Sequence, residues 1–249
     1  MTAAGFAGGI QHLESHTFAR FHSAGRMYEM HRYVLHGPKA GHEPIRLGLF
    51  AGVHGDEPAG SLALLQFLED LTAEPGPAVG YELWAYPWVN PTGAEDGTRE
   101  NRAGKDLNRE FWKGSEEPEV QAIEAELRAQ RFQGLITLNA DDTCEGHYGY
   151  AHGQVLDDAL LRPALRAAER VLPRDRRSTI DGFSAREGVI NHCFQGILSG
   201  PPDQRPRPFN LIFETPAHAL LHDQVAAHAA ALNAILAAYR GFIAYGQDL

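Results

Sequence analysis

The stretch of residues 46–71 reads RLGLFAGVHGDEPAGSLALLQFLEDL and contains the clearest strand and helix patterns of the chain. Its first part is a short apolar run followed by histidine and glycine, which predicts a buried β-strand over residues 46–53. Apolar residues at helical spacing follow and predict a helix over residues 57–71. The apolar side of that helix is expected to comprise Leu62, Leu64, Leu65 and Leu68. A strand that leads into a helix through a tight turn is the repeating unit of α/β proteins.

The rest of the chain continues this alternation of strand and helix patterns. Further strands are predicted over residues 27–35, 81–89, 134–138 and 209–213. Further helices are predicted over residues 118–131, 156–171 and 218–243. The alternation favours an α/β fold with a largely parallel core sheet and helices on both faces. No change of composition marks an internal boundary, so we expect residues 1–249 to form one catalytic domain.

The overall composition narrows the class of protein. Of the 249 residues, 43% are hydrophobic and 22% are charged, as in ordinary globular proteins. The net charge of -10 disfavours nucleic acid as a partner, because phosphates are bound by basic surfaces. No apolar stretch is long enough to span a bilayer, so no membrane partner is expected, and the N-terminal residues lack the pattern of a signal peptide. With only two cysteines, we predict a cytoplasmic protein without a disulfide framework.

Polar residues follow three of the predicted strands. They lie at residues 54–57 (HGDE), 139–142 (NADD) and 214–215 (ET). Ligands of open α/β sheets bind outside the carboxyl ends of strands, so these residues are candidates for a site. His54 and Glu57 are three apart at a turn into a helix, and both residue types bind zinc. Taken alone, the pair is better explained as a polar turn residue and an acidic residue in the first helical turn.

A long polar stretch, residues 90–117, separates the predicted strand 81–89 from the next helix. It begins NPTGAEDGTRENRAGKDLNREFW. Four of its basic residues, Arg99, Arg102, Lys105 and Arg109, fall within eleven positions. Guanidinium groups bind carboxylates and stabilise an oxyanion that develops on a carbonyl oxygen. A solvated surface loop is the alternative, but that interpretation does not explain the length of the stretch.

Four motifs in a fixed order resemble the zinc carboxypeptidase superfamily. They are GVHGDEPAG (52–60), NPTG (90–93), TRENR (98–102) and GKDLNREFW (104–112). This superfamily includes the succinylglutamate desuccinylase and aspartoacylase branch and small murein-peptide amidases. The resemblance runs over residues 46–215 and implies a mixed, mostly parallel central sheet flanked by helices on both faces.

The resemblance also implies one zinc ion per chain. His54 and Glu57 match the first two zinc ligands of the family, whereas Asn139 stands where the family has a histidine. An amide oxygen suits harder cations better than zinc, so we expect Asn139 to hold the metal weakly. Two alternatives are that the site has lost its metal or that a neighbour is the third ligand. The neighbours considered are Asp141, Asp142 and His147.

The remaining site residues follow from the same resemblance. Arg102 matches the arginine that polarises the scissile carbonyl, and Asn108 and Arg109 match the pair that grips the substrate carboxylate. Glu214, which follows the predicted strand 209–213, matches the catalytic glutamate that accepts a proton from water. We also expect Tyr148 to line the substrate pocket, although it could equally pack against the edge of the sheet.

These observations predict a zinc-dependent hydrolase that cleaves an amide bond next to a free carboxylate, of the carboxypeptidase or murein-peptide amidase type. Its substrate would be a small peptide or an N-acyl amino acid. One alternative is an N-acyl amino acid deacylase of the desuccinylase and aspartoacylase type. The chain ends soon after the helix that follows Glu214, without room for the additional β domain of that branch, which favours the first interpretation. The other alternative is a metal-poor carboxylate-binding homologue, because Asn139 replaces a histidine ligand.

Overall fold

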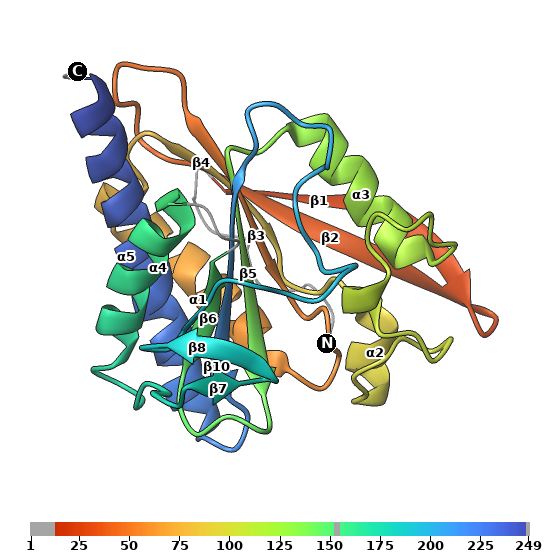
Figure 1. Ribbon diagram of the computed structural model, residues 1–249. Helices are drawn as coiled ribbons and strands as arrows, with labels where there is room; N and C mark the ends of the chain where they lie inside the picture. The colour runs from red at the N-terminus through yellow and green to blue at the C-terminus, as the bar shows by residue number, and fades with distance from the viewer. Residues whose placement is uncertain (1–12, 152–154, 248–249) are drawn as a thin grey trace.

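The computed structural model describes residues 13–151 and 155–247. Their strands form a ten-stranded sheet in the order β1-β2-β4-β3-β5-β10-β6-β9-β8-β7 (Figure 1). The strands are β1 (Leu13–Ser23), β2 (Arg26–His36), β3 (Ile45–Ala51), β4 (Tyr81–Tyr86), β5 (Gly134–Asp141), β6 (Tyr148–Ala151), β7 (Thr179–Ile180), β8 (Phe183–Arg186), β9 (Val189–Ile190) and β10 (Phe209–Pro216).

The centre of the sheet consists of four parallel strands, β4, β3, β5 and β10. The hairpin β1–β2 extends it on one side, with β2 antiparallel to β4. On the other side β6 runs antiparallel to β10, and the short strands β9, β8 and β7 follow. The prediction of a mixed sheet with a parallel core is confirmed, and the antiparallel additions at both edges are findings of the structure.

Helices cover both faces of the sheet, as predicted (Figure 1). The face covered by α1, α4 and α5 forms the larger core, in which Leu64, Leu161 and Leu232 pack against strand residues. On the opposite face α3 packs with aromatic residues of β3 and β4, among them Phe50 and Tyr86. The helices are α1 (Pro58–Ala73), α2 (Pro91–Asp96), α3 (Pro118–Gln130), α4 (Val155–Ala168) and α5 (Leu221–Gln247), with 3-10 turns at η1 (Gly76–Ala78) and η2 (Leu107–Arg109).

Several predicted boundaries shift by a few residues. The first helix begins at Pro58, a residue type suited to the first helical position because its missing N–H has no partner there. Leu62 is 38% exposed, so the prediction that it faces the core is wrong, and Phe67 is buried instead. The predicted strand 81–89 ends at Tyr86, before a proline that cannot donate to the ladder.

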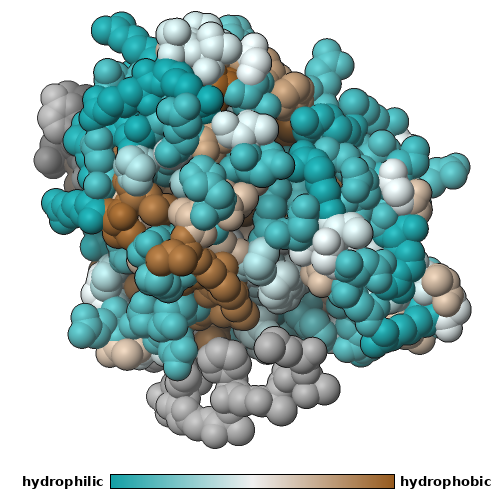
Figure 2. Space-filling view, turned by 90° about the horizontal axis from the view of Figure 1, so that it is seen from below, coloured by the Kyte–Doolittle hydropathy of each residue, from teal (hydrophilic) through white to brown (hydrophobic). Residues whose placement is uncertain are grey.

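The parallel strands end together at the lower edge of the sheet in Figure 1. Figure 2 shows the molecule from this side, with hydrophilic side chains over most of the face and a smaller hydrophobic area left of centre. Asn139 of β5 lies beside Glu214 of β10, which in turn lies beside Tyr148 of β6. The sheet register therefore places three of the predicted site residues in one row.

Among residues 13–151 and 155–247, no helix has the length and apolar character needed to cross a bilayer. The N-terminal residues used to predict the absence of a signal peptide lie mostly outside the described part of the chain.

Candidate active site

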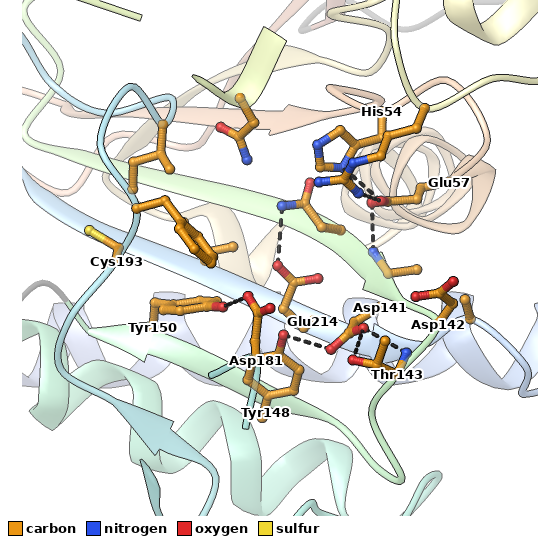
Figure 3. A pocket seen from close by; sticks show the side chains of 18 of the residues that line it. His54, Glu57, Asp141, Asp142, Thr143, Tyr148, Tyr150, Asp181, Cys193 and Glu214 are labelled. Atoms are coloured by element: carbon orange, nitrogen blue, oxygen red, sulfur yellow. Dashed lines mark hydrogen bonds and ion pairs between the residues drawn. The ribbon is translucent and has the colours of Figure 1, made fainter. Parts of the chain in front are cut away.

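A cavity of about 350 Å³ opens where β3, β5 and β10 end (Figure 3). All predicted site residues except Arg102 line it: His54, Glu57, Asn108, Arg109, Asn139, Tyr148 and Glu214. In Figure 3, His54 and Glu57 lie on one side of the cavity, Tyr150 and Asp181 on the other, and Glu214 between them. Segments that are far apart in the sequence therefore meet at the place predicted from strand ends.

The turn between β3 and α1 brings two candidate ligand atoms together. His54 Nδ1 lies 2.6 Å from Glu57 Oε1, and both residues are buried. The other Glu57 oxygen accepts a hydrogen bond of 2.8 Å from the Ala140 backbone N–H. A Cβ on Gly55 would lie 1.9 Å from the Gly93 carbonyl carbon, so the turn approaches α2 as closely as only glycine permits.

Asp106 orients His54 from behind. Its Oδ1 lies 3.2 Å from His54 Nε2 and accepts a 2.9 Å hydrogen bond from the Asn108 backbone N–H. Although burial opposes the charge, the hydrogen bond and charge of His54, with Arg99 nearby, hold the pKa of Asp106 well below its usual range. Burial lowers the pKa of His54, but hydrogen bonds to Asp106 and Glu57 raise it to about 9. A carboxylate behind an imidazole is a common arrangement at metal sites.

Arg99, and not Arg102, is the arginine beside His54 and Glu57. Its Nη2 lies 3.1 Å from Asp106 Oδ2, and its Nη1 lies 3.4 Å from Glu57 Oε1 and 3.3 Å from His54 Nδ1. Arg99 lines the cavity, and Asp106 lies directly behind the lining residues. Sequence reasoning named Arg99 only as one of several basic residues that could bind a carboxylate or an oxyanion. It gave Asp106 no role, although Asp106 stands two residues before the predicted Asn108 in DLNR.

Arg102 does not reach the cavity, which corrects the role predicted for it. Its guanidinium donates to Asp96 and Glu95 at the end of α2 and to the Tyr28 hydroxyl of β2. The two carboxylates are adjacent in sequence, and the Arg102 backbone N–H also donates to Thr92 Oγ1 of α2 at 3.1 Å, so this residue is held at α2. Arg102 therefore attaches α2 to the hairpin β1–β2.

Asn139 presents an unsatisfied oxygen. Its Nδ2 donates to Glu214 Oε1 at 3.3 Å, whereas its Oδ1 is buried without a hydrogen-bond partner in the described residues. Such an atom costs free energy unless a ligand or ion satisfies it. Burial, followed by the charge of Glu57, raises the pKa of Glu214 above its usual range.

The other candidates for a third ligand are placed differently. His147 lies outside the cavity, where its Nε2 bonds the Leu165 carbonyl at 3.0 Å. Asp141 accepts a hydrogen bond of 2.9 Å from the Tyr148 hydroxyl and two from Thr143, and Asp142 is exposed at the mouth. Within the described ranges, no group of three or more His, Cys, Asp or Glu residues is arranged to hold a metal ion. A metal bound by His54 and Glu57 would thus take Asn139 as its third protein ligand.

The predicted carboxylate-binding pair also lines the cavity. Asn108 Oδ1 accepts a 2.8 Å hydrogen bond from the Leu198 N–H, which fixes the neighbouring loop. Arg109 donates to the Asn108 carbonyl at 2.9 Å, and its guanidinium lies 4.1 Å from the centroid of the Phe194 ring. No carboxylate of the described residues forms an ion pair with Arg109, so its charge is available to a ligand.

Residues 44–148 match the family model described as the succinylglutamate desuccinylase/aspartoacylase catalytic domain. The fold matches a protein of Shewanella amazonensis proposed to be a metallopeptidase, with 26% identity, a TM-score of 0.73 and coverage of 90% of this chain and 85% of that one. The chain has the fold of the zinc carboxypeptidase-like superfamily, and residues 44–148 are similar to one branch of it. A second Shewanella protein, from S. denitrificans and also proposed to be a metallopeptidase, has 24% identity, a TM-score of 0.73 and coverage of 90% and 83%.

More distant members of the superfamily share the fold. A metallo-carboxypeptidase of Burkholderia cenocepacia has 18% identity and a TM-score of 0.72, and the match covers 94% of this chain and 66% of that one. No curated protein is significantly similar in sequence to this chain. The zinc carboxypeptidase-like fold expected from the four motifs is therefore confirmed.

Proposed function

We propose that the protein is a metal-dependent hydrolase that cleaves an amide bond next to a free carboxylate, of the carboxypeptidase or murein-peptide amidase type. One observation carries the proposal. A single cavity brings the pair His54 and Glu57 and the buried Glu214 together with Arg109, a cation that has no ion-pair partner among residues 13–151 and 155–247. Candidate metal ligands, a base and a carboxylate anchor are the groups that this reaction requires.

The residues present fit a divalent cation. His54 Nδ1, Glu57 Oε1 and the otherwise unsatisfied Asn139 Oδ1 would hold it, and we propose one zinc ion per chain. When bound, the ion would polarise the scissile carbonyl and lower the pKa of water. Because Asn139 is neutral and offers oxygen, zinc should be held less tightly than by a histidine.

Glu214 is the proposed general base. It lies buried on the same sheet face as Asn139, and the Asn139 amide orients its carboxylate at 3.3 Å. Glu214 would accept a proton from the attacking water and pass it to the departing amine. A raised pKa suits both halves of that role, since the same carboxyl must bind and release the proton.

We assign stabilisation of the oxyanion to Arg99. Its guanidinium adjoins both His54 and Glu57, and Asp106 holds it in place. A fixed cation next to the developing negative charge lowers the barrier to its formation. Arg109, assisted by Asn108, would bind the substrate carboxylate and so place the amide bond between Arg99 and Glu214.

The test compares wild-type protein with the Glu214→Gln variant. Both are first supplied with zinc, and the unbound zinc is then removed. The substrates tested would be peptides with a free carboxyl terminus, murein-type peptides and N-acyl amino acids. Chromatography of the products would measure their hydrolysis. Loss of the base should lower kcat by about 10²- to 10⁴-fold, with zinc content per chain unchanged. Wild-type turnover in the variant would refute the role of Glu214, and no hydrolysis of any substrate by wild-type protein would refute the proposed function.

Two other functions have an observation in their favour. The family matched by residues 44–148 is named for enzymes of the desuccinylase and aspartoacylase type, which favours deacylation of N-acyl amino acids. Asn139 at the third ligand position favours a binding protein that holds carboxylates without hydrolysis. The same substrate panel, with zinc content measured alongside, separates these functions from the first.

A further inference from the structure

The cavity holds more negative charge than its cations neutralise, even when a divalent ion bound at His54 and Glu57 adds two positive charges to its two arginines. Its acidic residues are Asp56, Glu57, Asp141, Asp142, Asp181 and Glu214, and its arginines are Arg99 and Arg109. Arg99 is already paired with Asp106 and Glu57. In residues 13–151 and 155–247, none of the four cavity aspartates has an Arg, Lys or His nitrogen within the 4.0 Å of an ion pair.

This charge balance disfavours ligands that carry several carboxylates. An N-acyl derivative of aspartate or glutamate brings at least two, but in the described part of the chain Arg109 is the one cavity arginine without a carboxylate partner. A second carboxylate would enter a cleft of like charge, which repels it and selects against it. A ligand with one carboxylate and one cation matches both signs of charge in the cavity.

Asp181 is the aspartate best placed to receive the cation. It lies in the turn between β7 and β8, and the hydroxyl of Tyr150 on β6 donates to its Oδ2. That hydrogen bond holds the carboxylate toward the cavity, beside Tyr150 and across from His54 in Figure 3. The other oxygen, Oδ1, makes no hydrogen bond within the described residues. By contrast, Asp141 is occupied by Tyr148 and Thr143.

Apolar side chains line the same part of the cavity. Phe194, Ile197 and Ile212 belong to the small core that also contains Tyr150. The long side chains of lysine and arginine place an aliphatic stem against such surfaces and keep the charged end near water. Arg109 lies against Phe194, so the carboxylate anchor and this apolar wall adjoin.

We propose that the substrate carries one carboxylate, bound by Arg109, and a separate ammonium or guanidinium group on an aliphatic stem, bound by Asp181. This inference rests on the proposed function, because it uses the same cavity and carboxylate anchor. Asp181 and Tyr150 thereby determine specificity, and the amide next to a cationic residue is the bond cleaved. Acidic N-acyl amino acids are excluded.

A binding measurement tests this inference independently of hydrolysis. The Glu214→Gln variant would be titrated calorimetrically with benzoylglycyl-lysine, benzoylglycyl-norleucine and benzoylglycyl-glutamate. Lysine and norleucine have stems of similar length, so their comparison isolates the charge. We expect the lysine peptide to bind about fivefold or more tightly than the norleucine peptide, the effect of about one partly exposed ion pair. The glutamate peptide should bind most weakly.

A second substitution assigns the effect to one residue. When Asp181→Asn is added to the Glu214→Gln variant, the lysine and norleucine peptides should bind with nearly equal affinity. The matched control is Asp203→Asn, since Asp203 is an exposed aspartate that pairs with Arg128 outside the cavity. It should leave the preference unchanged.

The outcomes are distinguishable. Equal binding of the lysine and norleucine peptides, tighter binding of the glutamate peptide, or binding of none of the three would overturn the inference. A preference for lysine that survives Asp181→Asn would overturn the role of Asp181. If the preference holds but wild-type protein hydrolyses none of the peptides, the proposed hydrolase activity fails and the inference about the ligand stands.

Discussion

Acidification should destabilise this protein through His228, a residue of α5 beneath the strand that carries Glu214. The ring is 0% exposed, with Nε2 at 3.2 Å from Thr215 Oγ1 and Nδ1 without a partner in the described residues. It packs edge-on against Phe213, with ring centroids 5.6 Å apart. Burial, followed by the charge of His147, lowers the pKa of His228 from 6.5 to about 3.

The direction of the effect follows from where the proton binds. Below pH 6.5 the unfolded chain protonates His228, while the folded protein resists protonation down to about pH 3. The contribution of the neutral ring to stability is therefore complete above pH 6.5 and declines as the pH falls below it. The decline is about 1.4 kcal/mol per pH unit, or about 2 kcal/mol between pH 6.5 and about pH 5.

The assay is urea unfolding of wild-type protein and His228→Gln at several pH values between about 7.5 and 5. Glutamine retains a hydrogen-bonding group for Thr215 but does not titrate. Between about pH 7.5 and 5, the free energy of unfolding of the variant should therefore fall by about 2 kcal/mol less than that of the wild type. His222→Gln, which changes a histidine with a side chain 77% exposed, is the matched control. Parallel pH profiles for wild type and His228→Gln would refute the reasoning.

Three further predictions concern the site. Arg99→Ala should lower kcat by about 10²- to 10³-fold, while Arg102→Ala should leave kcat nearly unchanged and lower the free energy of unfolding only slightly. Steady-state kinetics and urea unfolding check both, and the reverse pattern would restore the role first predicted for Arg102. Asn139→His should increase zinc retained per chain after dialysis by about tenfold, as measured by elemental analysis, and no gain would mean that Asn139 is not a ligand. Gly55→Ala should cost about 1–3 kcal/mol in urea unfolding because its methyl group would meet the Gly93 backbone; unchanged stability would contradict that close approach.

The parallel core could be predicted because its strands are continuous apolar runs, such as residues 46–53 and 134–138. The outer strands give a weaker signal. β1 has only partly buried or exposed residues, so no apolar alternation marks it. β7 and β9 have two residues each, too few for any periodicity. These strands form through pairing with neighbours, which local sequence does not encode.

The candidate site also contains residues that could be predicted from the sequence and residues that could not. His54 and Glu214 follow buried strands directly, so their place at the carboxyl edge could be predicted from sequence. Arg99 and Arg102 stand three residues apart in a loop, and sequence offers no physical means of telling which one faces the cavity. The choice depends on carboxylates that folding brings near, Asp106 for Arg99 and Asp96 for Arg102.

The position of β10 has a consequence for biosynthesis. This strand is the last in the chain but lies between β5 and β6 in the sheet. In a nascent chain, β5 is therefore an unpaired edge strand until residues 209–216 have emerged from the ribosome. Helix α5, which covers one face of the sheet together with α1 and α4, emerges later still. An interrupted translation product ending before residue 209 would expose both the unpaired edge and the apolar face, and is expected to aggregate rather than form a partial fold.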